Sequence, residues 1–199
     1  MSAPKILVFA ASTRKESFNR RLAAVIARKS SGLGASITEL DLRDHALPIY
    51  DGDFEAAQGV PEAGQTLHAL FRTHHGIFIA SPEYNAGVTP LLANVLAWVS
   101  RVTTHGGMQA AFGTPVFALG SASPGRFGGY RGLMALRQSL VLQLGAQVLP
   151  AMVSLGEAPH AFDDAGNLAV GAQDQMASRL VDQFLDALAP HRASSDAGK

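Results

Sequence analysis

The stretch 11–20, ASTRKESFNR, holds the residues whose types and spacing best suit the binding of an anion. Directly in front of a helical pattern it places hydroxyl groups, a guanidinium and a carboxamide, carried by Ser12, Thr13, Ser17, Arg14 and Asn19. The first turn of a helix offers unpaired N–H groups and about half a positive charge, so it is a ready site for a phosphate. The simpler interpretation is a polar loop whose Ser17 caps the helix. Position and residue types favour the phosphate site.

The absence of two glycine-rich motifs narrows the range of phosphate-containing ligands that this loop could bind. The chain has no G-x-G-x-x-G, which weakens the case for a dinucleotide site, and no G-x-x-x-x-G-K-[ST], which argues against a P-loop. A loop with few glycines and many hydroxyl groups suits a terminal monophosphate better than a pyrophosphate inside a longer ligand. The residues therefore indicate flavin mononucleotide, FMN.

Two more unusual loops follow strand patterns further along the chain. Residues 81–90, SPEYNAGVTP, lie between two prolines, so a rigid backbone can present N–H and C=O groups to a heterocycle, with Tyr84 over or beside its face. Residues 120–130, GSASPGRFGGY, are rich in glycine and let the backbone approach a planar ligand closely. Arg126 suits an anionic flavin or a phosphate of a nicotinamide cofactor. The alternative for the loop 81–90 is a stiff turn with an exposed tyrosine, and the alternative for Arg126 is a solvated side chain without a ligand.

The elements that must position these loops are visible as hydrophobic patterns. Short apolar runs predict buried parallel strands at 5–11, 76–81, 115–119 and 147–155, and alternation of apolar and polar residues predicts a further strand at 35–42. Helical patterns begin after Ser17, open at Pro61 and at Pro90, and cover 133–144 and 176–188. The segment 41–60 is predicted to be rich in loops.

Strands that alternate with helices predict an α/β fold with three layers and a doubly wound parallel sheet. The Rossmann order and the flavodoxin-like order, 2-1-3-4-5 over five strands, both fit this alternation. In either, ligands bind beyond the carboxyl ends of the strands, where the strand order reverses. The three unusual loops all fall at that edge.

Composition excludes several classes of protein. The 199 residues suit one domain, expected over 1–192, followed by a short polar tail at 193–199 that we expect to be disordered. Charge is balanced at 16 basic and 16 acidic residues, which removes a general electrostatic case for nucleic acid. The chain has no Cys, so redox chemistry needs a bound cofactor. No signal-peptide or membrane-spanning pattern is visible, the histidines show no metal-ligand spacing, and a cytoplasmic protein is expected.

Three segments together carry a resemblance to a known family: 11–23, ASTRKESFNRRLA; 81–101, SPEYNAGVTPLLANVLAWVSR; and 121–150, SASPGRFGGYRGLMALRQSLVLQLGAQVLP. In their order and spacing they resemble the NADPH-dependent FMN reductase family, which includes quinone, azo-dye and chromate reductases. The similarity runs over most of residues 5–190, and PEYN is its most specific element.

The resemblance implies FMN at the strand ends of a flavodoxin-like sheet, with NADPH or NADH as co-substrate. It implies a phosphate held by Ser12, Arg14, Ser17, Phe18 and Asn19. It implies an isoalloxazine ring lined by Pro82, Glu83, Tyr84 and Asn85, largely through backbone groups, and closed on its other side by Ser121 and Gly125. Such proteins are similar in forming homodimers or homotetramers, and Arg101 and Tyr130 are candidates for that interface or for the acceptor pocket.

The sequence departs from the family pattern at three positions. Ala11 stands where the family usually has glycine, which restricts φ and puts the loop geometry or the FMN affinity in question. Ala93 and Ala97 replace a lysine and an aspartate that are common in the helix after PEYN. An interface salt bridge therefore cannot be carried over from the family.

The function expected from these observations is the transfer of electrons from NADPH through FMN to a small acceptor: a quinone, an azo compound, chromate or free flavin. The expected cycle is ping-pong, and FMN carries the chemistry, so no side chain is assigned as catalytic. The alternatives are an FMN-binding electron carrier and a redox-responsive binding protein without turnover. A hydrolase is disfavoured because the S-x-x-K at 12–15 lacks its partner motifs.

Overall fold

A parallel β-sheet forms the centre of the protein in the computed structural model, which describes residues 3–189. Its five strands lie in the order β2-β1-β3-β4-β5, which confirms the flavodoxin-like order and rules out the Rossmann order. The strands are β1 (Lys5–Ala10), β2 (Ser36–Leu40), β3 (Gly76–Ala80), β4 (Val116–Ala122) and β5 (Gln147–Leu155). Each strand starts within one residue of its predicted position.

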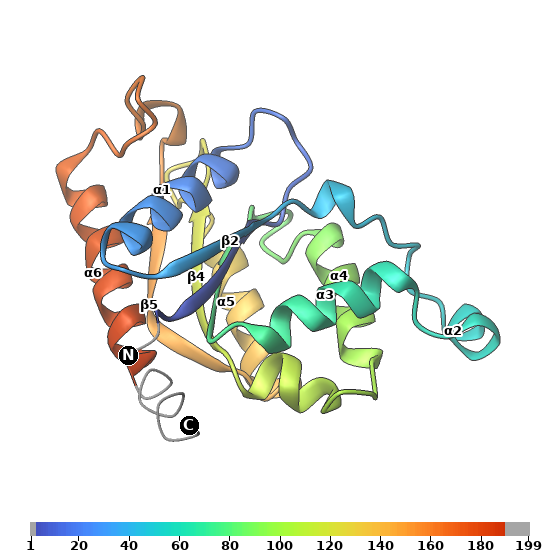
Figure 1. Cartoon of the computed structure of the whole chain (residues 1–199). Helices are drawn as coiled ribbons and strands as arrows, with labels where there is room; N and C mark the ends of the chain where they lie inside the picture. Colours follow the sequence, from blue (N-terminus) through green and yellow to red (C-terminus); the bar gives the residue numbers. More distant parts are fainter. Residues whose placement is uncertain (1–2, 190–199) are drawn as a thin grey trace.

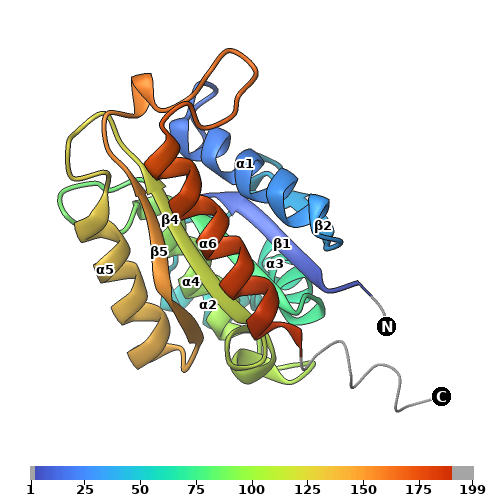
Figure 2. The same cartoon turned by 90° about the vertical axis from the view of Figure 1, so that its left-hand side faces the viewer.

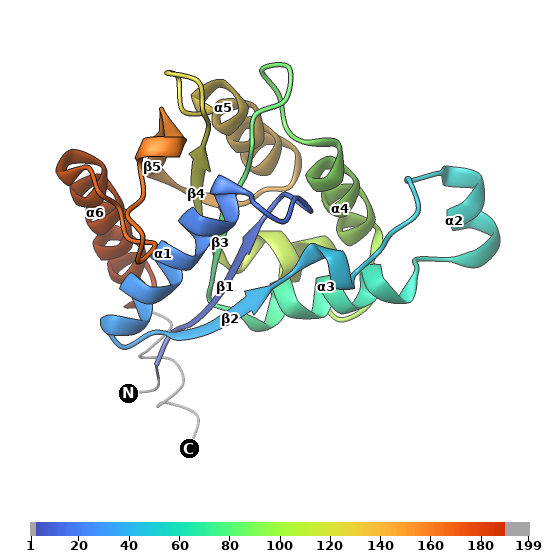
Figure 3. The same cartoon turned by 90° about the horizontal axis from the view of Figure 1, so that it is seen from above.

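Helices cover both faces of the sheet (Figure 1). The α-helices are α1 (Phe18–Gly32), α2 (Gly52–Gln58), α3 (Glu62–Thr73), α4 (Pro90–Arg101), α5 (Tyr130–Gln138) and α6 (Gly171–Ala187). Figure 3 shows α1 and α6 on one face, and α3, α4 and α5 on the other. Alternate residues of β1 divide between two buried clusters: Ile6 and Val8 pack on the α1/α6 side, whereas Leu7 and Phe9 pack on the other. This layering is the one that the strand–helix alternation predicts.

The segment 41–60, predicted to be rich in loops, contains the helix α2, which stands away from the body of the molecule (Figure 1). Asp51 caps it by accepting hydrogen bonds from the N–H groups of Asp53 at 2.8 Å and Phe54 at 3.2 Å. None of the residues of α2 is buried. A helix with no buried face leaves no hydrophobic period in the sequence, and that is why the pattern missed it.

Strand β4 is longer than predicted, because residues 120–122 pair with β5 instead of opening a loop. A Cβ at Gly120 would lie 2.8 Å from the ring of Phe78 on the neighbouring strand. This glycine therefore makes room for an aromatic side chain in the core. The loop after β4 covers only 123–129.

No helix within residues 3–189 combines the length and the apolar character needed to cross a membrane. The tail predicted at 193–199 lies outside the described residues.

Candidate functional site

The carboxyl ends of β1, β3 and β4 bring the three unusual loops together around one pocket. Figure 2 shows the loops after β3 and β4 at the same end of the sheet as the start of α1. The pocket is lined by Ser12, Arg14, Ser17, Phe18 and Asn19 from the first loop, by Pro82, Glu83 and Tyr84 from the second, and by Ala122, Ser123 and Pro124 from the third. Segments that are more than a hundred residues apart in the chain thus line the same pocket.

The first turn of α1 forms one end of this pocket and keeps its hydrogen-bond donors free. Ser17 occupies the N-cap position, as predicted, but its side chain makes no capping bond. Its carbonyl accepts the N–H groups of Arg20 and Arg21, whereas those of Phe18 and Asn19 have no acceptor within residues 3–189. No acidic residue lies in this first turn to compete for them. The helix end is therefore electropositive and open to an anion.

Two side chains from the same loop lie close to these free amides. Ser12 is 7% exposed, and its hydroxyl accepts the N–H of Arg14 at 3.3 Å, which fixes the turn. The guanidinium of Arg14 is exposed and has no partner among the described residues. An uncommitted guanidinium beside free helix amides matches the donor set that a phosphate monoester needs.

Asn19 has a different task from the one that the sequence suggested for its side chain. Its carboxamide donates to the carbonyl of Ala122 at 2.9 Å and accepts the N–H of the same residue at 2.9 Å. The contact is buried and joins the start of α1 to the end of β4. Asn19 can therefore offer a ligand only its backbone N–H, while its side chain holds two walls of the pocket at a fixed spacing.

The second loop turns sharply at its tip. Tyr84 and Gly87 exchange both backbone hydrogen bonds, at 3.2 and 2.9 Å, around Asn85 and Ala86. Both central residues have positive φ, 52° and 59°, the signature of a type I′ turn. Tyr84 is 47% exposed at the mouth of the pocket, and Asn85 is exposed at the tip and not part of the pocket lining.

The third loop lies tightly on the end of β5. Gly128 has a φ of 59°, and a Cβ there would lie 2.8 Å from the N of Gly156. In return, a Cβ at Gly156 would lie 2.6 Å from the carbonyl O of Arg126. The hydroxyl of Ser154 donates to the carbonyl of Phe127 at 3.1 Å. The glycines thus serve close backbone packing, and the loop is held against β5.

Four residues predicted to contact the ligand do not line the pocket: Asn85, Ser121, Gly125 and Arg126. Ser121 is completely buried and its hydroxyl has no partner. The side chain of Arg126 is 90% exposed and lies 4.0 Å from Glu157. Sequence reasoning missed Ala122, Ser123 and Pro124, because it ended β4 too early and gave the glycines the role of contacting the ligand.

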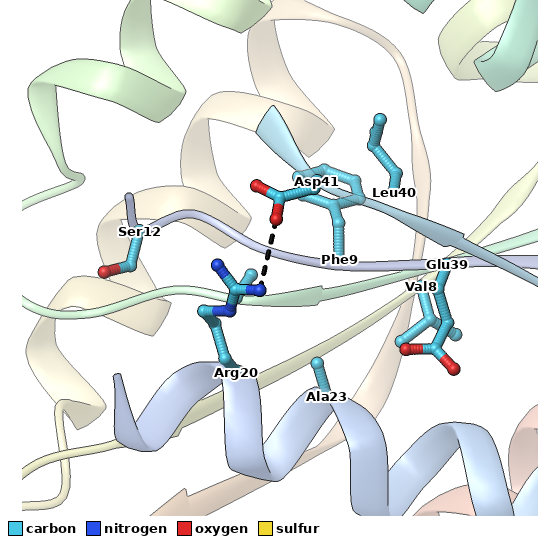
Figure 4. A pocket seen from close by; sticks show the side chains of 9 residues that line it. Val8, Phe9, Ser12, Arg20, Ala23, Glu39, Leu40 and Asp41 are labelled. Carbon is cyan, nitrogen blue, oxygen red and sulfur yellow. Dashed lines mark ion pairs between the residues drawn. The ribbon is translucent and has the colours of Figure 1, made fainter. Parts of the chain in front are cut away.

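A second hollow lies behind Ser12, between β1, β2 and α1 (Figure 4). In it, Arg20 forms an ion pair with Asp41 at 3.1 Å, drawn as the dashed line. Hydrogen bonds from the Arg43 side chain, joined by its backbone N–H and by the charge of Arg20, hold the pKa of Asp41 well below its usual range despite some burial. The carboxylate is therefore charged at all physiological pH values, and the pair ties the end of β2 to the first turn of α1.

The two interface candidates from the sequence differ in their surroundings. Arg101 donates through Nε to both carboxylate oxygens of Glu55 at 3.0 Å, and Glu55 also accepts the hydroxyl of Tyr50 at 2.8 Å. Arg101 is therefore engaged within its own chain, where it holds α2 on α4. Tyr130, at the start of α5, is 50% exposed. Among the described residues no group of His, Asp or Glu could hold a metal ion.

The donor set of the pocket fits an FMN phosphate at its α1 end. The fit rests on three features of this turn. The backbone amides of Phe18 and Asn19 are free, the Ser17 side chain makes no capping bond, and the Arg14 guanidinium has no partner among the described residues. Helix ends leave such groups exposed only when water or a ligand satisfies them. The pocket extends from there to residues of the second and the third loop.

Comparison with known proteins agrees with this geometry. The model of the family described as NADPH-dependent FMN reductase matches residues 4–160. A quinone reductase of Pseudomonas putida is 34% identical over 165 residues, 82% of this chain and 83% of the relative. An NAD(P)H-dependent FMN reductase of Pseudomonas aeruginosa is 32% identical over 185 residues, 92% of each chain.

Solved structures show the same fold. The flavoenzyme NAD(P)H:(acceptor) oxidoreductase FerB from Paracoccus denitrificans superposes with a TM-score of 0.77 at 23% identity, over 95% of this chain and 99% of the other. RosB with a bound flavin-phosphate intermediate superposes with a TM-score of 0.71 at 13% identity, over 99% of this chain and 88% of the other. At these identities the likeness establishes the flavodoxin-like fold.

Proposed function

Because this chain belongs to the NADPH-dependent FMN reductase family, we propose that it is an FMN-dependent oxidoreductase that passes electrons from NADPH or NADH to a small acceptor by a ping-pong cycle. The observation that carries the proposal is the start of α1, where two backbone amides, a serine and an arginine converge without partners of their own. Such a corner matches the terminal phosphate of FMN.

FMN held here would supply the hydride and electron transfer between the reduced nicotinamide and the acceptor, chemistry for which a chain without Cys has no side chain of its own. The residues of this chain bind and orient. Ser12, Ser17 and Arg14 hold the phosphate together with the amides of Phe18 and Asn19. Pro82, Glu83 and Tyr84 on one side, and Ala122, Ser123 and Pro124 on the other, form the walls that receive the ring.

The acceptor class follows from the relatives and from the openness of the site. Two of the relatives are named for the reduction of quinones and of FMN. Tyr84 at the mouth of the pocket is 47% exposed, Phe127 in the third loop is 72% exposed, and flat aromatic side chains suit flat acceptors. We propose quinones as the first acceptors to assay, followed by azo compounds, chromate and free flavin.

Self-association as a homodimer or homotetramer is part of the proposal. A shallow hollow between α4 and residues 139–144 is lined by Val88, Leu96 and Leu144, and Val141 and Leu142 in the latter segment are 39% and 69% exposed. Exposed apolar groups gathered on one face are typical of protein interfaces. Light scattering on the purified protein measures the state.

The test of the proposed function is a spectroscopic cycle on the purified protein. FMN added to the apoprotein is expected to lose fluorescence and to bleach on anaerobic addition of NADPH. The colour is expected to return when benzoquinone is added, with one equivalent of hydroquinone formed for each NADPH. An apoprotein that neither quenches FMN nor speeds the reaction of NADPH with quinone would contradict the proposal, whereas bleaching without turnover would favour an electron carrier.

Replacing Arg14 with alanine is predicted to weaken FMN binding about ten- to a hundredfold, because a charge-assisted hydrogen bond to phosphate contributes about 1.5–3 kcal/mol. Riboflavin, which lacks the phosphate, is predicted to bind the variant as it binds the parent protein. Fluorescence titration with both flavins measures the difference. Lys15→Ala is the matched control, since Lys15 is an exposed cation in the same loop but does not line the pocket. Equal losses for both flavins would show that the phosphate lies elsewhere.

A further inference from the structure

We propose that Glu83 and Arg131 form a latch that holds the second and third loops at a fixed separation, and that Glu83 is a positioning residue for the flavin ring. The inference rests on the proposed function for its ligand. It assigns to the Glu83 side chain a task apart from ligand contact, because the carboxylate is bonded to α5.

The contacts of Glu83 leave its carboxylate fully engaged. Oε1 accepts from the guanidinium of Arg131, with Nε at 2.9 Å and Nη2 also in contact. Oε2 accepts the backbone N–H of Gly132 at 3.0 Å. The Glu83 side chain is 10% exposed, against 59% for Arg131. Burial would raise the pKa of Glu83, but the Gly132 N–H and the Arg131 guanidinium outweigh it and hold the pKa below its ordinary value.

Helix α5 needs this carboxylate, because it has no cap of its own. Its N-cap residue is Gly129, which has a φ of 80° and no side chain with which to bond the first amides. No acidic residue lies in its first turn either. Glu83, from a loop 49 residues away in the chain, accepts the Gly132 N–H instead. A charged acceptor at a helix N-terminus is also favoured by the helix dipole.

The two segments approach closely because glycine stands at the contact. A Cβ at Gly132 would lie 3.0 Å from the Cβ of Glu83 and 3.0 Å from the carbonyl O of Gly87. Both atoms belong to the second loop, so the start of α5 lies directly on that loop. The latch is therefore a close backbone contact between the second loop and the start of α5, reinforced by an ion pair.

Arg131 extends the junction to the third loop. Its guanidinium carbon lies 5.4 Å from the centre of the Phe127 ring, a cation–π distance. Phe127 is in the third loop and Glu83 in the second, so Arg131 contacts both. Since residues of both loops line the pocket, we expect the latch to set the space available to a planar ring.

The test is flavin binding to the apoprotein variants Glu83→Gln, Arg131→Met and the double variant. Glu83→Gln keeps the size of the side chain but removes its charge, and it is expected to weaken FMN and riboflavin by the same factor, about tenfold. The red shift of the flavin absorption band on binding is expected to shrink as well. In the double variant the loss is expected to be no greater than in Glu83→Gln alone, because the same interaction is removed.

Asp174→Asn is the matched control. Asp174 pairs with Lys29 at 2.8 Å between α6 and α1, away from the pocket, so this variant also exchanges a paired carboxylate for an amide. It is expected to leave both flavin affinities unchanged. Hydrogen exchange on the apoproteins gives a readout without ligand: the Gly132 amide is expected to exchange faster in Glu83→Gln and at the parent rate in Asp174→Asn.

The outcomes separate the latch from the proposed function. Failure of the parent protein to bind any flavin overturns the proposed function, while faster exchange at Gly132 in Glu83→Gln still supports the junction of the loops. If the parent protein binds FMN but Glu83→Gln binds both flavins with unchanged affinity, or loses FMN and not riboflavin, the positioning role is overturned.

Discussion

Replacing Asn19 with alanine is expected to lower the free energy of unfolding by about 2–4 kcal/mol and to abolish tight FMN binding. The substitution removes both hydrogen bonds to Ala122 and leaves a buried N–H and a buried carbonyl without partners. Each buried group left unsatisfied costs about 1–3 kcal/mol. The loss of binding follows because the start of α1 and the end of β4 are two walls of the same pocket.

The measurement for Asn19 is urea unfolding followed by FMN titration of the folded variant. Asn94→Ala is a close control, because Asn94 makes the same pair of bonds elsewhere: it accepts the N–H of Tyr50 at 2.8 Å and donates to the carbonyl of Pro48 at 2.9 Å. That contact is more exposed and holds the segment before α2. Asn94→Ala is expected to cost less stability and to leave FMN affinity unchanged. Equal effects of the two variants on FMN would refute the role given to Asn19.

Replacing Gly129 with alanine is the second change with a large expected effect. A Cβ there would overlap the hydroxyl of the completely buried Ser121, and the residue has a φ of 80°. Left-handed backbone costs a residue with a Cβ about 1–2 kcal/mol, and overpacking adds about 1–3 kcal/mol. We expect a loss of about 2–5 kcal/mol in stability, and displacement of the loop 123–129 with a loss of flavin binding of about a hundredfold or more.

The variant Gly145→Ala separates the cost of the left-handed backbone from the cost of overpacking. Gly145 has a φ of 65°, but a Cβ there has no atom within 4 Å, so only the backbone cost applies. We expect it to lose about 1–2 kcal/mol and to bind FMN as the parent protein does. Thermal unfolding and flavin titration of both variants give the comparison. If Gly129→Ala matches Gly145→Ala in both measurements, Ser121 and the loop 123–129 accommodate the added Cβ without a packing cost, and the prediction is wrong.

The central strands β1, β3 and β4 could be predicted from the sequence because they are buried on both faces and form short, continuous apolar runs. The edge strand β2 is only partly buried and was recognised by its alternation. The strand order and the edge that carries the loops were predicted correctly. The family was also predicted correctly from three segments, and the family match confirms it. Helix α2 was missed, because it depends on Asp51 and on the contact of Phe54 with Trp98, which leave no local period.

The candidate site was predicted in its location and less well in its details. Eight of the twelve predicted ligand contacts line the pocket, since helix starts and strand ends can be read locally. The partners of Asn19 and Glu83 could not be predicted locally, because they lie at the end of β4 and at the start of α5, 103 and 49 positions away in the chain. Close packing against neighbouring segments, which the structure shows for Gly128 and Gly129, leaves no local signal in the sequence.

The most direct test of the account is a crystal structure of the protein grown with FMN. We predict electron density for the phosphate at the N–H groups of Phe18 and Asn19, with the guanidinium of Arg14 against it and the ring between the second and third loops. Density for the phosphate at any other place, or a first turn of α1 closed by the protein's own side chains, would contradict the account.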